Sequence, residues 1–139
     1  MVYCITGSRR GEESIEVTFI LIGLGGAAGS MARFALGNFI TSRSKSDFPF
    51  GTFLINIIGA FLLGIAVSAG LGTSLSLLVA QGFLGAFTTF STFMFESFTL
   101  IENKRLNRAV LYIAASILLG VLSFSMGYYA VGLLPGRKY

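Results

Sequence analysis

Four hydroxyl residues, Thr88, Thr89, Ser91 and Thr92, interrupt an apolar stretch where a membrane helix would normally carry Leu, Ile and Val. Hydroxyl groups donate hydrogen bonds, and the first backbone N–H groups of a helix carry positive partial charge. If a helix restarts near Thr89, with Thr88 or Thr89 as its N-cap, its positive end lies near the bilayer midplane. This pattern is suited to attracting an anion inside a membrane.

The restarted helix would present two adjacent faces. Phe90 and Phe93, spaced i, i+3, share one face, and Thr89, Thr92 and Glu96 form a polar line beside it. The two faces would meet at a groove. With 14 Phe in the chain, core packing is the commoner reason for two phenylalanines at this spacing, and the hydroxyls could equally satisfy a bent backbone.

Two further polar residues lie inside apolar stretches, where each needs a partner. Arg33 either snorkels to one interface or lines a vestibule that concentrates anions. Asn56 either bonds two helices together or binds an ion.

The composition explains why these residues stand out. The 139 residues are 54% hydrophobic and 12% charged, with a mean hydropathy of +0.81, which indicates an integral membrane protein in a lipid bilayer. The net charge of +4 is that of membrane-flanking residues and not of a nucleic-acid surface. Without His, and with Cys4 as the single cysteine, metal sites made of His or several Cys and catalysis by a Cys-His or Ser-His pair are excluded, so an enzyme is least expected.

We expect an all-α membrane protein whose single domain, residues 17–134, follows a polar N-terminal tail, residues 1–16, and precedes a C-terminal tail, residues 135–139. The tail before the first span need not be ordered, and a signal peptide is disfavoured by its glutamates. Four helices are predicted over residues 17–40, 50–71, 77–100 and 109–134. Turns are predicted at residues 41–49, 72–76 and 102–108, and Pro135 would end the last helix.

Glycines suggest where these helices pack and where one breaks. Gly25 and Gly29 form a thin face that lets another helix approach closely. Gly82 and Gly85 lower helix propensity just before the hydroxyl block, so we expect the third helix to break near the midplane. Such a break survives in hydrocarbon where its freed backbone groups are buried in protein or face a wet cavity.

Charge counting leaves the orientation of the chain undecided. Four spans put both termini on one side, with four Lys and Arg residues against five on the other. The positive-inside rule then barely selects an orientation, and four helices alone enclose no water path. We therefore predict an antiparallel homodimer with the two broken stretches side by side.

The chain resembles the Fluc (CrcB) family of fluoride channels over nearly its whole length from Phe19. The resemblance lies in GGAAGSMAR (Gly25–Arg33), FPFGTFLIN (Phe48–Asn56), GFLGAFTTFSTFMFE (Gly82–Glu96) and the pair Tyr112 and Ser116. It implies a dual-topology dimer in the inner (plasma) membrane, with two antiparallel pores that passively export fluoride from the cytoplasm.

The resemblance also implies roles for individual residues. It assigns these residues to the fluoride path: Arg33, Asn56, Thr89, Phe90, Ser91, Thr92, Phe93, Glu96, Tyr112 and Ser116. It further implies a structural Na⁺ at the dimer centre, held by the backbone carbonyls of Gly85 and Thr88.

Two other kinds of protein remain alternatives at this point. A small dual-topology, proton-coupled multidrug transporter would need a titratable carboxylate near mid-membrane, and Glu96 is the single acidic residue inside the predicted spans. A noncatalytic packing subunit of a larger complex would leave Asn56 and the broken helix without a purpose.

Overall fold

The computed structural model describes residues 3–43 and 48–132, with side chains from Ile15 onward, and this part of the chain consists of helices joined by short turns, without a strand. Its elements are α1 (Tyr3–Arg43), α2 (Phe50–Ser68), α3 (Thr73–Ser76), the π-helix η1 (Leu77–Leu84), α4 (Gly85–Phe87), α5 (Phe90–Glu102) and α6 (Leu106–Gly132). Four stretches are long and apolar enough to cross a membrane: Ile15–Arg43, Phe50–Ser68, Thr73–Glu102 and Leu106–Gly132. The predicted four-span architecture is confirmed.

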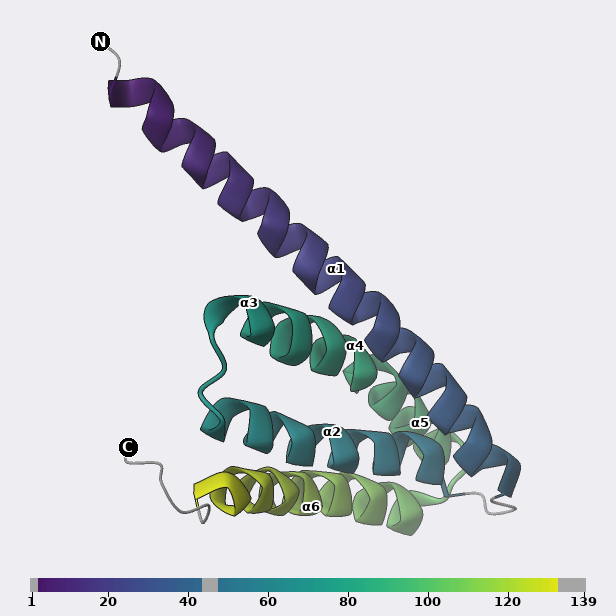
Figure 1. The fold of residues 1–139 in the computed structure, drawn as a ribbon. Coiled ribbons are helices and arrows are strands. Elements are labelled where there is room, and N and C mark those ends of the chain that lie inside the picture. The colour runs from purple at the N-terminus through teal and green to yellow at the C-terminus, as the bar shows by residue number, and fades with distance from the viewer. Residues whose placement is uncertain (1–2, 44–47, 133–139) are drawn as a thin grey trace.

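The first helix is longer than the predicted span. It begins at Tyr3 and so continues through most of the segment predicted as a polar tail. Figure 1 shows its N-terminal part extending beyond the other helices. The predicted C-terminal tail and the end of the last helix at Pro135 lie outside the described residues.

Two predicted turns are wrong in position. The turn after α2 spans residues 69–72, not residues 72–76, because Gly70 adopts a left-handed φ of 57° and Gly72 is extended, so a helix begins at Thr73. The charged loop before α6 is also shorter than predicted. It occupies residues 103–105, with Lys104 at a φ of 57°, so α6 starts at Leu106 instead of Ala109.

Glycines bring α1 against η1, as the sequence predicts. A Cβ placed on Gly25 would overlap the Leu78 carbonyl oxygen, and one on Gly29 would overlap the Phe83 carbonyl oxygen. Gly82 of η1 approaches α1 in return, because its Cβ would lie 2.8 Å from the Ile22 carbonyl oxygen. In a bilayer, burying apolar side chains between helices gains little free energy, because the lipid tails are equally apolar. Close backbone contact of this kind is therefore a main source of packing energy.

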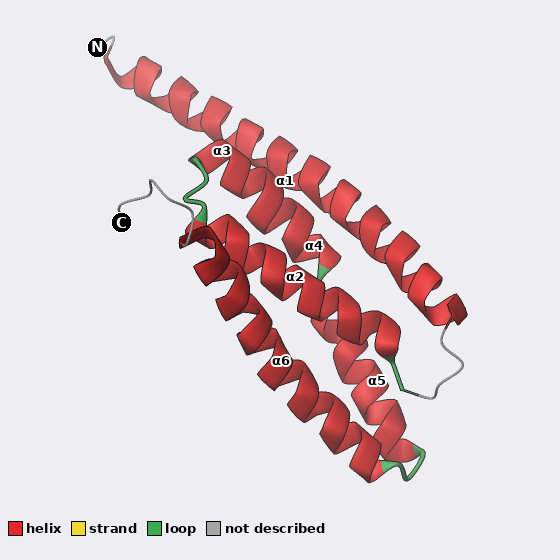
Figure 2. Cartoon of the chain, turned by 60° about the horizontal axis from the view of Figure 1, so that its bottom comes forward, coloured by secondary structure: helices red, strands yellow, loops and turns green. Residues whose placement is uncertain are grey.

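The same device joins α2 to α6, which lie along each other in both views (Figures 1 and 2). A Cβ on Gly64 would overlap the Phe124 carbonyl oxygen, and one on Gly127 would overlap the Phe61 carbonyl oxygen. Ser123 also donates a hydrogen bond to the Ile57 carbonyl oxygen at 2.9 Å. These contacts hold α2, which carries Asn56, against α6 along the length of both helices.

Candidate functional site

The third membrane span breaks between α4 and α5, at the short loop that Figure 2 shows between them. Thr88 is extended, with φ −79° and ψ 156°, and Thr89 follows with φ −144° and ψ 117°. The Thr89 hydroxyl accepts a hydrogen bond from the Thr92 N–H at 3.3 Å. Thr89, not Thr88, is therefore the N-cap of α5. Its hydroxyl oxygen accepts from the Thr92 N–H, which would otherwise lack a partner in the first turn of the helix.

The predicted cause of the break is wrong in one respect. Gly82 and Gly85 both keep helical geometry, Gly82 within η1 and Gly85 at φ −61° and ψ −35°. The chain leaves the helix three residues later, at Thr88, where hydroxyl groups offer alternative hydrogen bonds. Gly82 instead serves close packing on α1, and Gly59 of α2 leaves room for the Thr88 side chain, which a Cβ there would overlap.

Asn56 of α2 ties the break to the neighbouring helix. Its Nδ2 donates to the Thr89 carbonyl oxygen at 3.0 Å, and its Oδ1 accepts from the Thr89 N–H at 2.9 Å. Because Thr89 is only 8% exposed, these two bonds satisfy backbone groups that the interruption would otherwise leave buried and unpaired. The Asn56 amide has a second N–H, which is not used in this pair of bonds.

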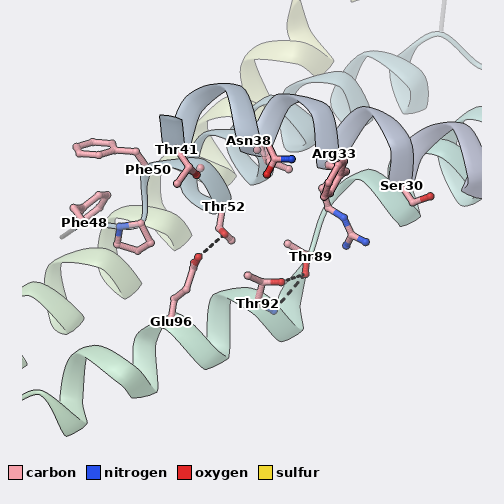
Figure 3. A pocket seen from close by; sticks show the side chains of 15 residues that line it. Ser30, Arg33, Asn38, Thr41, Phe48, Phe50, Thr52, Thr89, Thr92 and Glu96 are labelled. Atoms are coloured by element: carbon pink, nitrogen blue, oxygen red, sulfur yellow. Dashed lines mark hydrogen bonds between the residues drawn. The ribbon is translucent and has the colours of Figure 1, made fainter. Parts of the chain in front are cut away.

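A polar cavity of about 520 Å³ lies on one side of the break, between α1, α2 and α5. Its lining includes Arg33 of α1, Thr52 of α2, and Thr89, Thr92 and Glu96 of α5. Figure 3 shows Arg33 projecting toward the break. A guanidinium beside hydroxyl groups in a low-dielectric surrounding gives this cavity donors for an anion, which favours the vestibule interpretation of Arg33.

Glu96 is held at the edge of this cavity by two hydroxyl groups. Thr52 Oγ1 donates to Glu96 Oε1 at 2.8 Å, and the Tyr112 hydroxyl donates to Glu96 Oε2 at 2.8 Å. Sequence reasoning missed Thr52. The available signal was its position one turn before Asn56, because residues at i, i+4 share a helix face.

An apolar groove of about 350 Å³ lies on the other side of the break. Phe90 and Phe93 line it together with Asn56 and the backbone around Gly85 and Thr88. Their ring centroids are 6.1 Å apart, and Phe90 is 75% exposed. The predicted two faces of the restarted helix are therefore present, and Thr89 lines both the polar cavity and the groove.

Three predicted site residues lie outside both hollows. Tyr112 is fully buried, with its ring 5.2 Å from that of Phe93, and it reaches the polar cavity only through Glu96. Ser91 is exposed, with its Oγ 3.4 Å from the Thr89 hydroxyl. The Ser116 Oγ is buried and has no hydrogen-bond partner within the described part of the chain.

Comparisons with known proteins agree on one family. The model of the family described as CrcB-like protein, Camphor Resistance (CrcB), matches residues 20–128. A protein of Clostridium acetobutylicum named fluoride-specific ion channel FluC 2 is 56% identical over 111 residues, which cover 80% of this chain and 95% of the relative. A FluC 2 of Bacillus thuringiensis is 45% identical over 108 residues (78% and 92%). A FluC 1 of Carboxydothermus hydrogenoformans is 41% identical over 120 residues (86% and 98%).

Proposed function

This chain belongs to the CrcB family, and we propose that it is a fluoride-selective ion channel of the plasma membrane, through which fluoride leaves the cytoplasm passively. The observation that carries the proposal is the 56% identity to a fluoride-specific channel over 95% of that relative. It is a multi-pass membrane protein, with four helical spans in its described part that are suited to cross a bilayer. The proton-coupled multidrug transporter considered from the sequence is not supported, because the similar proteins are named as channels.

The geometry of the break suits the handling of a small, strongly hydrated anion. Stripping water from fluoride must be offset by strong donors or by positively polarised groups. The polar cavity supplies Arg33 and the Thr89 and Thr92 hydroxyls, and the Asn56 amide keeps a second N–H beside the groove. An anion that enters at the cavity would therefore meet donors up to the break.

Beyond the break the ion would pass the two phenylalanines. The edge of a phenyl ring carries the positive side of its quadrupole, so Phe90 and Phe93 can face an anion edge-on. Each such contact is weak, which favours throughput, because an ion that is bound too tightly does not leave. We assign Phe90, Phe93 and Asn56 to the narrow part of the path and Arg33 to its entrance.

The groove supports a dimer as the conducting unit. It is open along the side of the chain, with the exposed ring of Phe90 and the exposed backbone of Gly85 at its edge. A second copy would close the groove into a conduit. The near-equal basic charge on the two sides of the membrane favours an inverted copy, so we propose an antiparallel, dual-topology homodimer with two paths.

A Na⁺ at the dimer centre fits the backbone of the break. In a continuous helix the Thr89 N–H would bond the Gly85 carbonyl and the Thr92 N–H would bond the Thr88 carbonyl. Here the Thr89 N–H donates to Asn56 and the Thr92 N–H donates to the Thr89 hydroxyl. The carbonyls of Gly85 and Thr88 thus lose their regular donors, and hard oxygen atoms of this kind are suitable ligands for an alkali cation, which would hold the two breaks together.

Anion efflux from liposomes tests the channel function directly. The purified protein should release fluoride rapidly and chloride slowly, without a proton gradient. Phe93→Ile should abolish fluoride efflux. Phe98→Ile is the matched control, because Phe98 lies on the same helix, is 58% exposed and lines neither hollow. Absence of fluoride efflux from a folded dimer would refute the channel function.

A further inference from the structure

Two arginines lie on α1 just outside its membrane-spanning part. The charged run at the start of α1 ends at Glu16, so its apolar membrane window starts at Val17, and Arg9 and Arg10 precede it by eight and seven residues. At about 1.5 Å per residue, the backbone of Arg10 lies about 10 Å beyond the start of the window. The family match begins at residue 20, so neither arginine belongs to the part of the chain that the family shares.

These arginines balance the basic charge around the first helix. Arg9 and Arg10 flank the start of the window, and Arg43 and Lys45 flank its end. Lys and Arg within about 15–20 residues of a span decide its orientation, usually with most weight on the first helix. Acidic residues contribute little to this rule, so the glutamates of the same segment do not cancel the two arginines.

The balance of the whole chain depends on the same pair. Four membrane windows put both termini on one side, where Arg9, Arg10, Arg137 and Lys138 face five basic residues on the other side. Arg33 does not count, because it lines the polar cavity within the window. Without Arg9 and Arg10, two basic residues on the terminal side face five on the other side, and the first helix is flanked by basic charge at its C-terminal end alone. That chain would insert with its termini outside.

We infer that Arg9 and Arg10 keep the orientation of this chain undecided, so that both orientations are made in comparable amounts. The inference rests on the dual topology proposed above, in which an antiparallel dimer needs one chain of each orientation. The N-terminal end of α1 is then an orientation-determining segment that complements the basic loops of this particular chain.

The test compares the full chain with the double variant Arg9→Gln/Arg10→Gln. Orientation is measured with two fusions after Tyr139, one to a reporter active only in the cytoplasm and one to a reporter active only outside. The single thiol of Cys4 gives a second readout, from its labelling by a membrane-impermeant maleimide relative to the total after denaturation. Arg9→Lys/Arg10→Lys conserves the charge, and Glu12→Gln/Glu13→Gln changes the same segment without changing the basic count.

In the wild-type chain both reporters should be active, with about half of the thiol labelled from outside. In the Gln variant the cytoplasmic reporter should fall at least fivefold and nearly all labelling should be external, while both control variants behave as wild type. If the wild type is dual and the Gln variant remains so, the inference is overturned and the proposed dimer stands. If the wild type has one orientation, dual topology itself is refuted, and this inference with it.

Coexpression adds a functional readout. The Gln variant alone should not protect cells from fluoride, because it lacks inverted partners. A second chain with Lys45→Gln/Lys104→Gln/Arg108→Gln has the opposite bias, with four basic residues on the terminal side and two on the other. Resistance that returns only when both chains are made supports the inference, and full resistance from the Gln variant alone contradicts it.

Discussion

Replacing Asn56 with alanine should both loosen the helix break and stop fluoride flux. The side chain makes two hydrogen bonds to the backbone of Thr89, at 3.0 and 2.9 Å, and alanine makes neither. The Thr89 N–H and carbonyl would then be left without these partners in a residue that is 8% exposed. The amide that we assign to the ion path would also be lost.

The size of the stability loss follows from the two orphaned groups. A buried polar group without its partner costs about 1–3 kcal/mol, which gives about 2–6 kcal/mol for the pair. Thr89 borders the polar cavity, where water can replace part of what is lost, so we expect the lower half of this range, about 2–4 kcal/mol. Asn56→Asp retains an acceptor for the Thr89 N–H but adds negative charge, so it should abolish fluoride flux as well.

The assay is denaturant unfolding of the purified protein in detergent, followed by circular dichroism, in parallel with liposome efflux. Asn103→Ala is the matched control, because the Asn103 amide also donates to a backbone carbonyl, at 2.9 Å to Thr99, but is exposed. The control should lose about 1 kcal/mol or less and keep its flux. If Asn56→Ala is no less stable than Asn103→Ala, Asn56 does not hold the break together.

Three further changes test other parts of the structure. Thr89→Val removes the N-cap hydroxyl of α5 and should cost about 1 kcal/mol in unfolding free energy, whereas Thr89→Ser should be close to wild type; equal losses would contradict the capping role. Gly29→Ala places a Cβ on the Phe83 carbonyl and should cost about 1–3 kcal/mol, while Gly23→Ala, with open space around it, should not destabilise, and equal unfolding midpoints would refute the packing. Arg33→Gln should slow fluoride efflux several-fold, most strongly at low ionic strength, and an unchanged rate at low salt would remove Arg33 from the entrance.

The sequence predicts the architecture because a membrane narrows the choices. Long apolar stretches must be helices, and Gly25 and Gly29 have few uses other than close packing, which the contact with Phe83 confirms. The polar line of α5 is predictable for a similar reason, because helical spacing alone puts Thr89, Thr92 and Glu96 on one face.

The details that the sequence does not reveal are those that depend on another helix. Low helix propensity predicts that Gly82 and Gly85 break the helix. Gly82 instead stays helical, where its lack of a side chain allows close contact with α1, and the helix breaks at Thr88. The partner of Asn56 could not be deduced either, because the bond to Thr89 spans 33 residues. Ser116 was assigned through the resemblance, and among the residues that the structure describes its buried hydroxyl has no hydrogen-bond partner that spacing could have indicated.

The hydrogen bonds of the site also bear on how an ion could move through it. A donor that is already bonded within the protein gives an arriving anion only the difference between two hydrogen bonds, which is about 1.5–3 kcal/mol for a charged partner and not the full strength of either bond. The Thr52 hydroxyl is engaged by Glu96, and the Thr89 hydroxyl by Thr92. Fluoride would therefore exchange hydrogen-bond donors along the polar line, and no single position would bind it too tightly for rapid conduction. The carboxylate of Glu96 belongs to this arrangement, because it accepts the hydroxyl hydrogen atoms of Thr52 and Tyr112 and so fixes the Thr52 hydroxyl at the edge of the cavity.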